Sequence, residues 1–209
     1  MSKQSDQAAT VFIVDDDPAI RFAMQALMDS VNLKHEIYGS GDEFLQQFTD
    51  ERPGCLVLDI RMPGLGGLEL QEELLKRGNS LPVIFITGHG DVPMAVSAMK
   101  DGAVDFLTKP FQEGELLEKV KSAITYYQSS REHMLELQDL QTRVDSCTPR
   151  EQDVMRLLAK GLPNKGIAET LGISPRTVGI HRANVMDKMT ADSLPALVRM
   201  ITTLESGKI

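Results

Sequence analysis

The stretch Val11-Phe12-Ile13-Val14-Asp15-Asp16-Asp17 decides the fold, because an apolar run ends abruptly on three carboxylates. Three later runs end in the same way, 55–58 at Asp59, 83–86 at Thr87 and 104–108 at Lys109. Short runs rich in β-branched residues, separated by helical patterns, are typical of parallel strands, and an open α/β sheet carries its chemistry at the carboxyl ends of such strands. We therefore expect one pocket with several carboxylates, a hydroxyl and an ammonium group, a combination that binds a divalent cation and accepts a phosphoryl group.

The length and composition are those of a globular chain of one or two domains. Its 209 residues are 42% hydrophobic and 25% charged, which is ordinary for a soluble protein. No apolar stretch approaches the ~20 residues of a membrane span, and the first residues lack the apolar core of a signal peptide. Cys55 and Cys147 give neither a disulfide framework nor a metal-ligand spacing. We therefore expect a cytoplasmic protein with no membrane partner.

Charge is distributed unevenly along the chain, whose net charge is −8. Residues 1–125 carry 11 basic and 20 acidic side chains, and residues 126–145 carry 2 and 4. Residues 146–209 carry 9 and 6, a net charge of +3. Only this last segment has the sign that favours a polyanion, and because the excess is small the indication depends on a motif in the same segment.

Residues 8–125 alternate between strand and helix patterns. The expected strands cover 10–15, 34–38, 55–59, 82–87 and 104–108, and the expected helices cover 18–31, 41–49, 68–77, 91–101 and a segment starting near 113. The first helix has an apolar face that we predict to be buried, made of Ala19, Phe22, Ala23, Ala26 and Leu27. Ser40 and Glu43 have the spacing of a capping box. Five βα units with right-handed crossovers predict an α/β fold, a doubly wound five-stranded parallel sheet with helices on both faces.

Residues 126–147 link this domain to the rest of the chain, and their pattern allows two interpretations. No Pro or Gly interrupts 115–147, so residues 115–145 can form one helix of about 46 Å at ~1.5 Å per residue. The 3/4 spacing of Met134, Leu137, Leu140 and Val144 then favours a dimerising coiled coil. The alternative is a final domain helix and a flexible polar linker, because polar residues interrupt the apolar seam.

Residues 148–209 have the pattern of a small all-α domain. Thr148-Pro149-Arg150-Glu151 combines an N-cap, a proline at the first helical position and a glutamate that closes a capping box. Four helices are expected, from 149 to the stop at Gly161, over 164–171, from 175 to about 189, and over 194–204. A core of this size is marginal alone, so we expect help from a partner copy.

The motifs of the first domain resemble the signature set of receiver domains of two-component response regulators. The resemblance covers residues 10–125 and rests on Val14-Asp15-Asp16-Asp17, Leu58-Asp59 with Met62-Pro63-Gly64, Thr87-Gly88 and Lys109-Pro110-Phe111, in this order. It implies a flavodoxin-like fold in which Asp59 is the nucleophile that takes a phosphoryl group to form an aspartyl phosphate. It also implies a cis peptide bond before Pro110.

The same resemblance implies a metal site. Two carboxylates ~4 Å apart repel by about 4 kcal/mol at an effective dielectric of about 20, and a hard divalent cation removes that repulsion. Oxygen ligands suit Mg²⁺, or Mn²⁺ in its place. By resemblance, Asp16 and Asp59 bind the metal directly, Asp15 binds through water, and Arg61 contributes its backbone carbonyl. Lys109 then neutralises charge on the transferring group.

Two further residues report on the phosphoryl group in receivers. By resemblance, Thr87 donates its hydroxyl to a phosphoryl oxygen after transfer, and Phe106 is the switch aromatic that moves inward with it. Many receivers have tyrosine at this position, and because phenylalanine lacks the hydroxyl, a switch here depends on packing alone. The alternative is that Phe106 is a core strand residue. The chain is expected to be no enzyme beyond metal-dependent self-phosphorylation and autodephosphorylation at Asp59.

The second domain resembles the LuxR-type helix-turn-helix domain over residues 148–200. The match is carried by Thr148-Pro149-Arg150-Glu151, Gly161-Leu162-Pro163-Asn164-Lys165, Leu171-Gly172-Ile173-Ser174 and Thr177-Val178. With the receiver motifs in front of it, the chain resembles the NarL/FixJ group, and Arg182-Ala183-Asn184-Val185-Met186 is closer to its FixJ-like members. Double-stranded promoter DNA is the partner that this resemblance implies.

The helix expected at 175–189 has a buried and an exposed face at ~100° per residue. Val178, Val185 and Met189 fall together and are expected in the core. The second helix of such a motif lies in the major groove. Residues expected to contact bases or phosphates are Asn164, Lys165, Arg176, Thr177, Gly179, Ile180, Arg182, Ala183 and Lys188. Of these, Lys165, Thr177, Arg182 and Lys188 are the candidates for phosphate contacts. Because cations are few in each copy, tight binding is expected to need two copies on a two-fold site.

Together these motifs predict a phosphorylation-dependent transcription regulator. A cognate sensor histidine kinase is expected to phosphorylate Asp59, after which the chain forms a homodimer, binds promoter DNA and contacts RNA polymerase. Three alternatives from other classes remain, namely a phosphatase, a DNA-binding protein with a vestigial receiver and a signalling adaptor. For the second domain, the alternative is a helical dimerisation domain without DNA.

Overall fold

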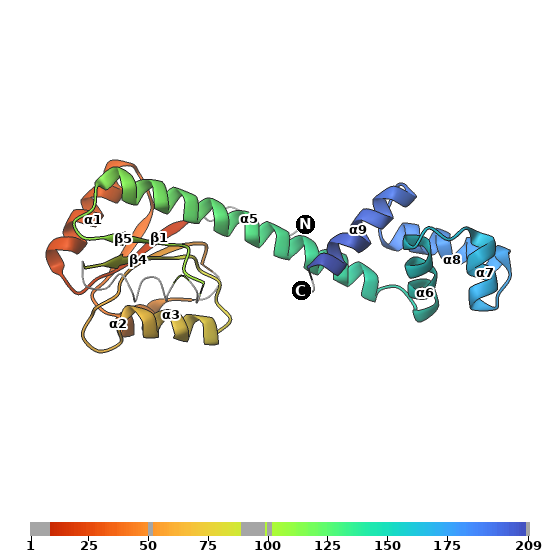
Figure 1. The fold of residues 1–209 in the computed structure, drawn as a ribbon, viewed down its shortest axis with the longest axis horizontal. Helices are drawn as coiled ribbons and strands as arrows, with labels where there is room; N and C mark the ends of the chain where they lie inside the picture. Colours follow the sequence, from red (N-terminus) through yellow and green to blue (C-terminus); the bar gives the residue numbers. More distant parts are fainter. Residues whose placement is uncertain (1–8, 50–51, 89–98, 100–101, 208–209) are drawn as a thin grey trace. The chain divides into compact units, whose positions relative to one another are not determined.

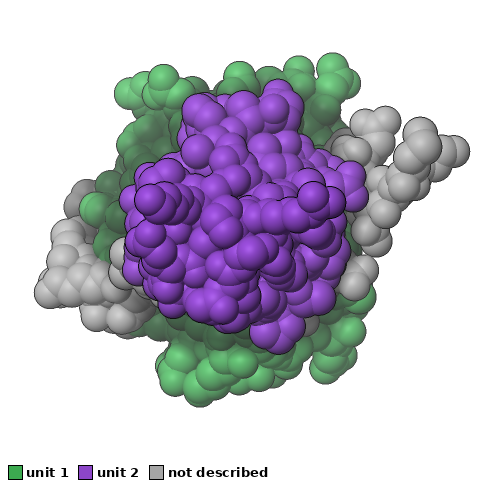
Figure 2. Space-filling model, turned by 90° about the vertical axis from the view of Figure 1, so that its right-hand side faces the viewer, with its two compact units in different colours: residues 1–130 green, residues 131–209 purple. Residues whose placement is uncertain are grey.

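The structure, a computed structural model, describes residues 9–49, 52–88, 99 and 102–207 and divides into two compact units (Figure 1). Unit 1 comprises residues 1–130 and unit 2 residues 131–209, and Figure 2 colours them separately. Within the described ranges, no helix combines the length and the apolar character needed to cross a lipid bilayer.

Unit 1 is built on a five-stranded sheet in which all paired strands are parallel, in the order β2-β1-β3-β4-β5. The strands are β1 (Thr10–Val14), β2 (His35–Tyr38), β3 (Gly54–Asp59), β4 (Val83–Thr87) and β5 (Asp105–Thr108). One face is covered by α1 (Pro18–Ser30) and α5 (Glu113–Asp145), the other by α2 (Gly41–Gln47) and α3 (Gly67–Lys76) (Figure 1). The doubly wound fold is therefore confirmed. The helix expected at 91–101 lies outside the described residues, apart from Met99.

The alternation of side chains along the strands divides the core of unit 1 into two layers. On β1, Phe12 packs in the layer below α2 and α3, whereas Val11 and Ile13 pack in the layer below α1 and α5. Phe12 also makes edge-to-face contacts with Phe44 and Phe48, with ring centroids 5.8 and 5.2 Å apart. The central strands are thus held by apolar contacts on both faces, which gives their carboxyl ends a fixed position.

The buried face of α1 differs from the predicted one. Met24, Leu27 and Met28 are buried against the sheet, whereas Phe22 is 74% exposed. The other exposed members of the predicted face are Ala19, Ala23 and Ala26. The prediction was right for Leu27 and wrong for the other four residues, because two apolar stripes run along this helix and the stripe of longer side chains removes more apolar surface from water when it is buried.

The first turns of α1 and α2 are capped by side chains. The Asp17 carboxylate accepts a hydrogen bond from the N–H of Ala19 at 2.8 Å. Ser40 Oγ accepts from the N–H of Glu43 at 3.1 Å, but the Glu43 carboxylate accepts from Gly39 at 2.7 Å instead of closing on Ser40. The expected capping box is therefore only half formed, and its second bond is shifted by one residue.

Helix α5 is continuous, as the first of the two interpretations for the linker expected. Its early turns belong to unit 1, where Leu116 and Val120 are fully buried, and its turns from Arg131 onward belong to unit 2. There Leu140 is only 5% exposed and Val144 packs against the core of the unit. These two members of the expected coiled-coil seam are therefore occupied by the chain's own helices.

Unit 2 adds four helices to the end of α5, namely α6 (Pro149–Ala159), α7 (Asn164–Leu171), α8 (Pro175–Lys188) and α9 (Leu194–Ser206). Thr148 and Glu151 form the complete capping box that the sequence predicts. Gly172 ends α7 in the left-handed conformation, with a φ of 65°, which glycine adopts without a steric penalty. The core of the unit includes the three residues predicted for α8, Val178, Val185 and Met189.

Candidate functional site

Four strand ends of unit 1 place polar side chains at one edge of the sheet. Asp15 directly follows β1, Asp59 ends β3, Thr87 ends β4 and Lys109 follows β5. Asp15, Asp59 and Thr87 are buried. Carboxylate oxygens of Asp15, Asp16 and Asp59 lie within 4.8 Å of one another. The residues predicted for a common pocket therefore come together.

The ammonium group of Lys109 bridges two of these carboxylates. Its Nζ donates to Asp15 Oδ2 at 2.9 Å and to Asp59 Oδ2 at 2.5 Å. Burial raises the pKa of Asp15 by more than its hydrogen bonds with Lys109 and Asp17 lower it. Burial lowers the pKa of Lys109, but the hydrogen bonds to Asp59 and Asp15 outweigh this effect and leave the pKa above its usual value. Lys109 is therefore held as a cation at the centre of the pocket.

The carboxylate oxygens of Asp15, Asp16 and Asp59 fit a hard divalent cation. Asp15 Oδ1 accepts from the N–H of Asp17 at 2.8 Å, and Asp59 Oδ1 accepts from the N–H of Arg61 at 3.1 Å, so backbone groups orient both carboxylates. Asp16 is exposed to solvent. Carboxylate oxygens are the ligands that Mg²⁺ prefers, and a cation offsets the repulsion between carboxylates at this spacing. The carbonyl of Arg61 as a further ligand stays a prediction.

Thr87, Phe106 and Lys109 lie on β4, on β5 and directly after β5. Thr87 Oγ1 donates to the carbonyl of Gly88 at 3.0 Å, and the Lys109 N–H donates to the carbonyl of Thr87 at 2.8 Å. The Lys109–Pro110 bond is cis, as expected. Phe106 is half-buried and packs against the core layer below α2 and α3. Its part in a switch stays a prediction.

Arg21 is a pocket residue that sequence reasoning missed. Its Nη1 donates to the backbone carbonyl of Asp15 at 2.7 Å, which ties the first turn of α1 to the end of β1. Its place one turn after the N-cap Asp17 was the available signal, because residues four apart on a helix lie on one face.

The candidate DNA-contacting residues of unit 2 lie on α7 and α8. The exposed members are Lys165, Arg176, Ile180 and Ala183, and the half-buried members are Asn164, Thr177, Gly179, Arg182 and Lys188. Ile180 is 57% exposed and is not part of the core of this unit. Arg182 Nη1 donates to Asn164 Oδ1 at 3.2 Å and so links the two helices.

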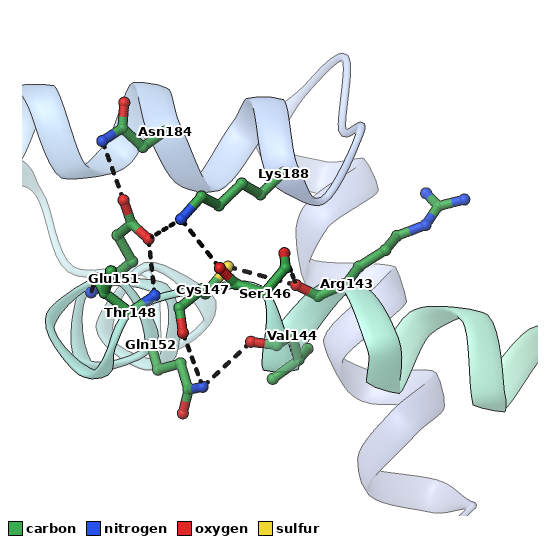
Figure 3. Close-up of polar contacts among 9 residues, drawn as sticks. All are labelled: Arg143, Val144, Ser146, Cys147, Thr148, Glu151, Gln152, Asn184 and Lys188. Carbon is green, nitrogen blue, oxygen red and sulfur yellow. Dashed lines mark hydrogen bonds and ion pairs between the residues drawn. The ribbon is translucent and has the colours of Figure 1, made fainter.

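Lys188 has partners inside unit 2, where we expected a phosphate contact. Its Nζ donates to Glu151 Oε2 at 2.6 Å and to the carbonyl of Ser146 at 3.0 Å (Figure 3). Glu151 is 3% exposed and also accepts from Asn184 Nδ2 at 3.0 Å. The Lys188 ammonium, followed by the N–H of Thr148, lowers the pKa of Glu151 to about 2. This pair was missed because its members are 37 residues apart, so no local pattern signals it.

Two family models match the chain. A family model of the response regulator receiver domain matches residues 11–121, and a model of bacterial regulatory proteins of the luxR family matches residues 145–201. The two matches define a two-component transcription regulator with a DNA-binding domain. The chain belongs to the NarL/FixJ family of response regulators.

Individual relatives match nearly the whole chain. Nodulation protein W of Bradyrhizobium diazoefficiens is 46% identical over 201 residues, which cover 96% of this chain and 88% of that protein. The transcriptional regulatory protein FixJ of the same organism is 44% identical over 190 residues, covering 91% and 93%. Among solved structures, the response regulator StyR is 42% identical with a TM-score of 0.84, covering 94% of this chain and 99% of that one. Full-length FixJ from B. japonicum is 41% identical with a TM-score of 0.59, covering 95% and 98%.

Proposed function

We propose that a cognate sensor histidine kinase phosphorylates Asp59 and that this modification controls DNA binding by α7 and α8. A carboxylate oxygen of Asp59 forms a bond to phosphorus while the phosphorus–nitrogen bond of the kinase phosphohistidine breaks. The observation that supports Asp59 is its set of contacts. One oxygen is oriented by the N–H of Arg61 and the other by the Lys109 ammonium, at the end of a buried central strand.

The neighbours of Asp59 have distinct parts in this proposal. Asp15, Asp16 and Asp59, with the carbonyl of Arg61, would hold Mg²⁺ or Mn²⁺, whose charge offsets that of the transferring group. Lys109 adds a second positive charge at the same carboxylates. Thr87 exchanges its hydrogen bond to the carbonyl of Gly88 for one to a phosphoryl oxygen. Attack of water on the same phosphorus returns the free carboxylate, so self-phosphorylation and autodephosphorylation occur at one residue.

In the DNA-binding unit, DNA is proposed to lie against the exposed face of α8. Arg176 and Ile180 are the candidates for base contacts, and Lys165 of α7 is the clearest candidate for a phosphate contact, since all three are exposed. Few cations lie on this face, so two copies on a two-fold site are required for tight binding. The phosphorylated chain is therefore proposed to be a homodimer that meets RNA polymerase at the promoter.

The decisive experiment offers the full chain a small phosphodonor, acetyl phosphate, with Mg²⁺. Wild type is expected to gain one phosphoryl group by intact mass spectrometry and to shift to a dimer in size-exclusion chromatography, whereas Asp59→Asn does neither. Asp29→Asn, which removes an exposed carboxylate near the far end of α1, is the matched control and should behave as wild type. Uptake by Asp59→Asn equal to that of wild type, or none by wild type, would refute the assignment.

A further inference from the structure

The C-terminal ends of α5 and α8 cap each other. The last carbonyls of a helix have no partners within the helix and attract cations. Lys188, in the last turn of α8, donates to the carbonyl of Ser146 just after α5 (Figure 3). In return, Arg143 in the last turn of α5 donates to the carbonyl of Met189 at 3.1 Å and to the hydroxyl of Thr190. Each helix thus supplies the cation for the end of the other.

Helix α6 joins the same arrangement. The side-chain amide of Gln152 donates to the carbonyls of Val144 and Cys147, at 3.1 and 3.2 Å (Figure 3). Glu151, one residue before, takes the hydrogen bond of Lys188 while it is almost fully buried. A buried carboxylate is strongly destabilising without its cation, so Lys188 cannot leave Glu151 for another anion without cost to the unit.

Apolar contacts fix the earlier turns of α5 in unit 2. Leu140 is buried and Val144 packs on the core of the unit. Leu137 lies so close to the end of α9 that a Cβ atom at Gly207 would be 2.6 Å from its Cδ1. The end of α5 therefore contacts α6, α8 and α9, although it precedes the segment of 148–209 expected to form the domain.

We infer that residues 131–145, the last turns of α5, are the first helix of the DNA-binding module and that Arg143 and Lys188 are positioning residues, which hold the C-terminal end of α8 so that its N-terminal half meets DNA. The inference rests on the proposed DNA-binding function of α8. It takes Lys188 out of the set of phosphate contacts and adds Arg143, which lies in α5, to the residues that determine DNA affinity.

The salt dependence of binding separates a positioning lysine from a phosphate contact. Each phosphate contact contributes about 0.9 to the slope of log K against log salt concentration, whereas a residue that acts through helix position contributes affinity without slope. The probe is a fluorescent duplex selected by the phosphorylated wild-type chain from a random-sequence library. Affinities are measured with full-length Lys188→Met, Arg143→Met, the double variant and Lys165→Met, over a range of KCl concentrations.

Lys188→Met and Arg143→Met are each expected to weaken binding roughly 3- to 30-fold with an unchanged slope. The fold-loss of affinity in the double variant should be smaller than the product of the two single fold-losses, because both changes disrupt the same contact between the ends of α5 and α8. Lys165→Met, the control, should lower the slope by about 1. Lys188→Arg keeps the cation and should recover most of the affinity.

A fall of about 1 in the slope for Lys188→Met would assign it to a phosphate and overturn the inference. Wild-type affinity in Arg143→Met would remove α5 from the module. If Lys188→Met does not fold, as judged by circular dichroism, Arg143→Met decides the question, because Arg143 lies in α5 and its loss should weaken binding with an unchanged slope. If wild type selects no duplex, the proposed DNA-binding function itself fails, which is a different outcome.

Discussion

Gly67→Ala tests how tightly β3, the strand that carries Asp59, is packed. Gly67 is the first residue of α3, and its N–H donates to the carbonyl of Ile60 at 3.0 Å. A Cβ atom at this position would overlap the backbone carbonyl oxygen of Asp59 and lie 3.0 Å from the Cα of Ile60. Both neighbours are backbone atoms, so no side chain can rotate to make room.

The expected loss of stability follows from the overlap between the added Cβ atom and the carbonyl oxygen of Asp59. Real Cβ atoms essentially never approach a heavy atom closer than 3.0 Å, so the Asp59 carbonyl must retreat by about 0.7 Å, an overpacking that costs about 3 kcal/mol. In a unit of this size the melting temperature should fall by roughly 10 °C. Because the strand carries Asp59, phosphoryl uptake should slow as well.

Tyrosine fluorescence measures the loss of stability in unit 1 alone. The chain has no tryptophan, and its three tyrosines, Tyr38, Tyr126 and Tyr127, all belong to unit 1. Gly114→Ala in the first turn of α5, where a Cβ atom meets nothing within 4 Å, is the matched control and should stabilise by about 0.5 kcal/mol. The reasoning is refuted if Gly67→Ala has the melting temperature of wild type and takes up phosphoryl groups from acetyl phosphate at the wild-type rate.

Three other changes have defined outcomes. Phe12→Ala removes the ring that contacts the edges or faces of both Phe44 and Phe48 and should destabilise unit 1 by about 4 kcal/mol in denaturant unfolding followed by tyrosine fluorescence; a loss no larger than that of a change at an exposed site would contradict the packing. The Lys188 ammonium, followed by the N–H of Thr148 and the side-chain amide of Asn184, lowers the pKa of Glu151 from 4.5 to about 2, so the stabilising contribution of Glu151 is complete above about pH 4.5 and is lost as the pH falls toward 2. The free energy of unfolding, followed by far-UV circular dichroism, should therefore differ less and less between wild type and Glu151→Gln as the pH falls from 4.5 toward 2. A difference that stays constant over this range would mean that the charge of Glu151 does not cause it. Gly172→Ala places a side chain in a left-handed conformation and should lower the free energy of unfolding by about 1 kcal/mol in the same assay. An unchanged free energy of unfolding would contradict this reasoning.

The sheet was predictable because its signals are local. Four of the five strands are apolar runs ended by a polar residue, and all five lie within about two residues of their expected bounds, as β3 (Gly54–Asp59) illustrates. The helix starts of unit 2 were predictable for the same reason, since caps such as Thr148 act over three residues. The face of α1 was not, because alanines and Phe22 form one stripe and longer side chains form another, and only the sheet selects between them.

The sites show the same division. Asp15, Asp59, Thr87 and Lys109 could be placed together because parallel strands align their carboxyl ends. Lys188 was assigned to a phosphate because a cation near the end of a recognition helix has that appearance in sequence. Its bond to a buried carboxylate depends on how α6 packs against α8, which is a property of the folded unit.

That α5 passes from one unit into the other has a consequence for recombining such chains. A foreign receiver joined at residue 148 would bring its own last helix against α6, α8 and α9, with unrelated side chains in place of Leu140 and Arg143. A junction placed before Arg131 would transfer those side chains together with the helices they contact. Chimaeras of this family should therefore be spliced inside α5, about one and a half turns or more ahead of Leu137, where the exchanged piece keeps its own first helix.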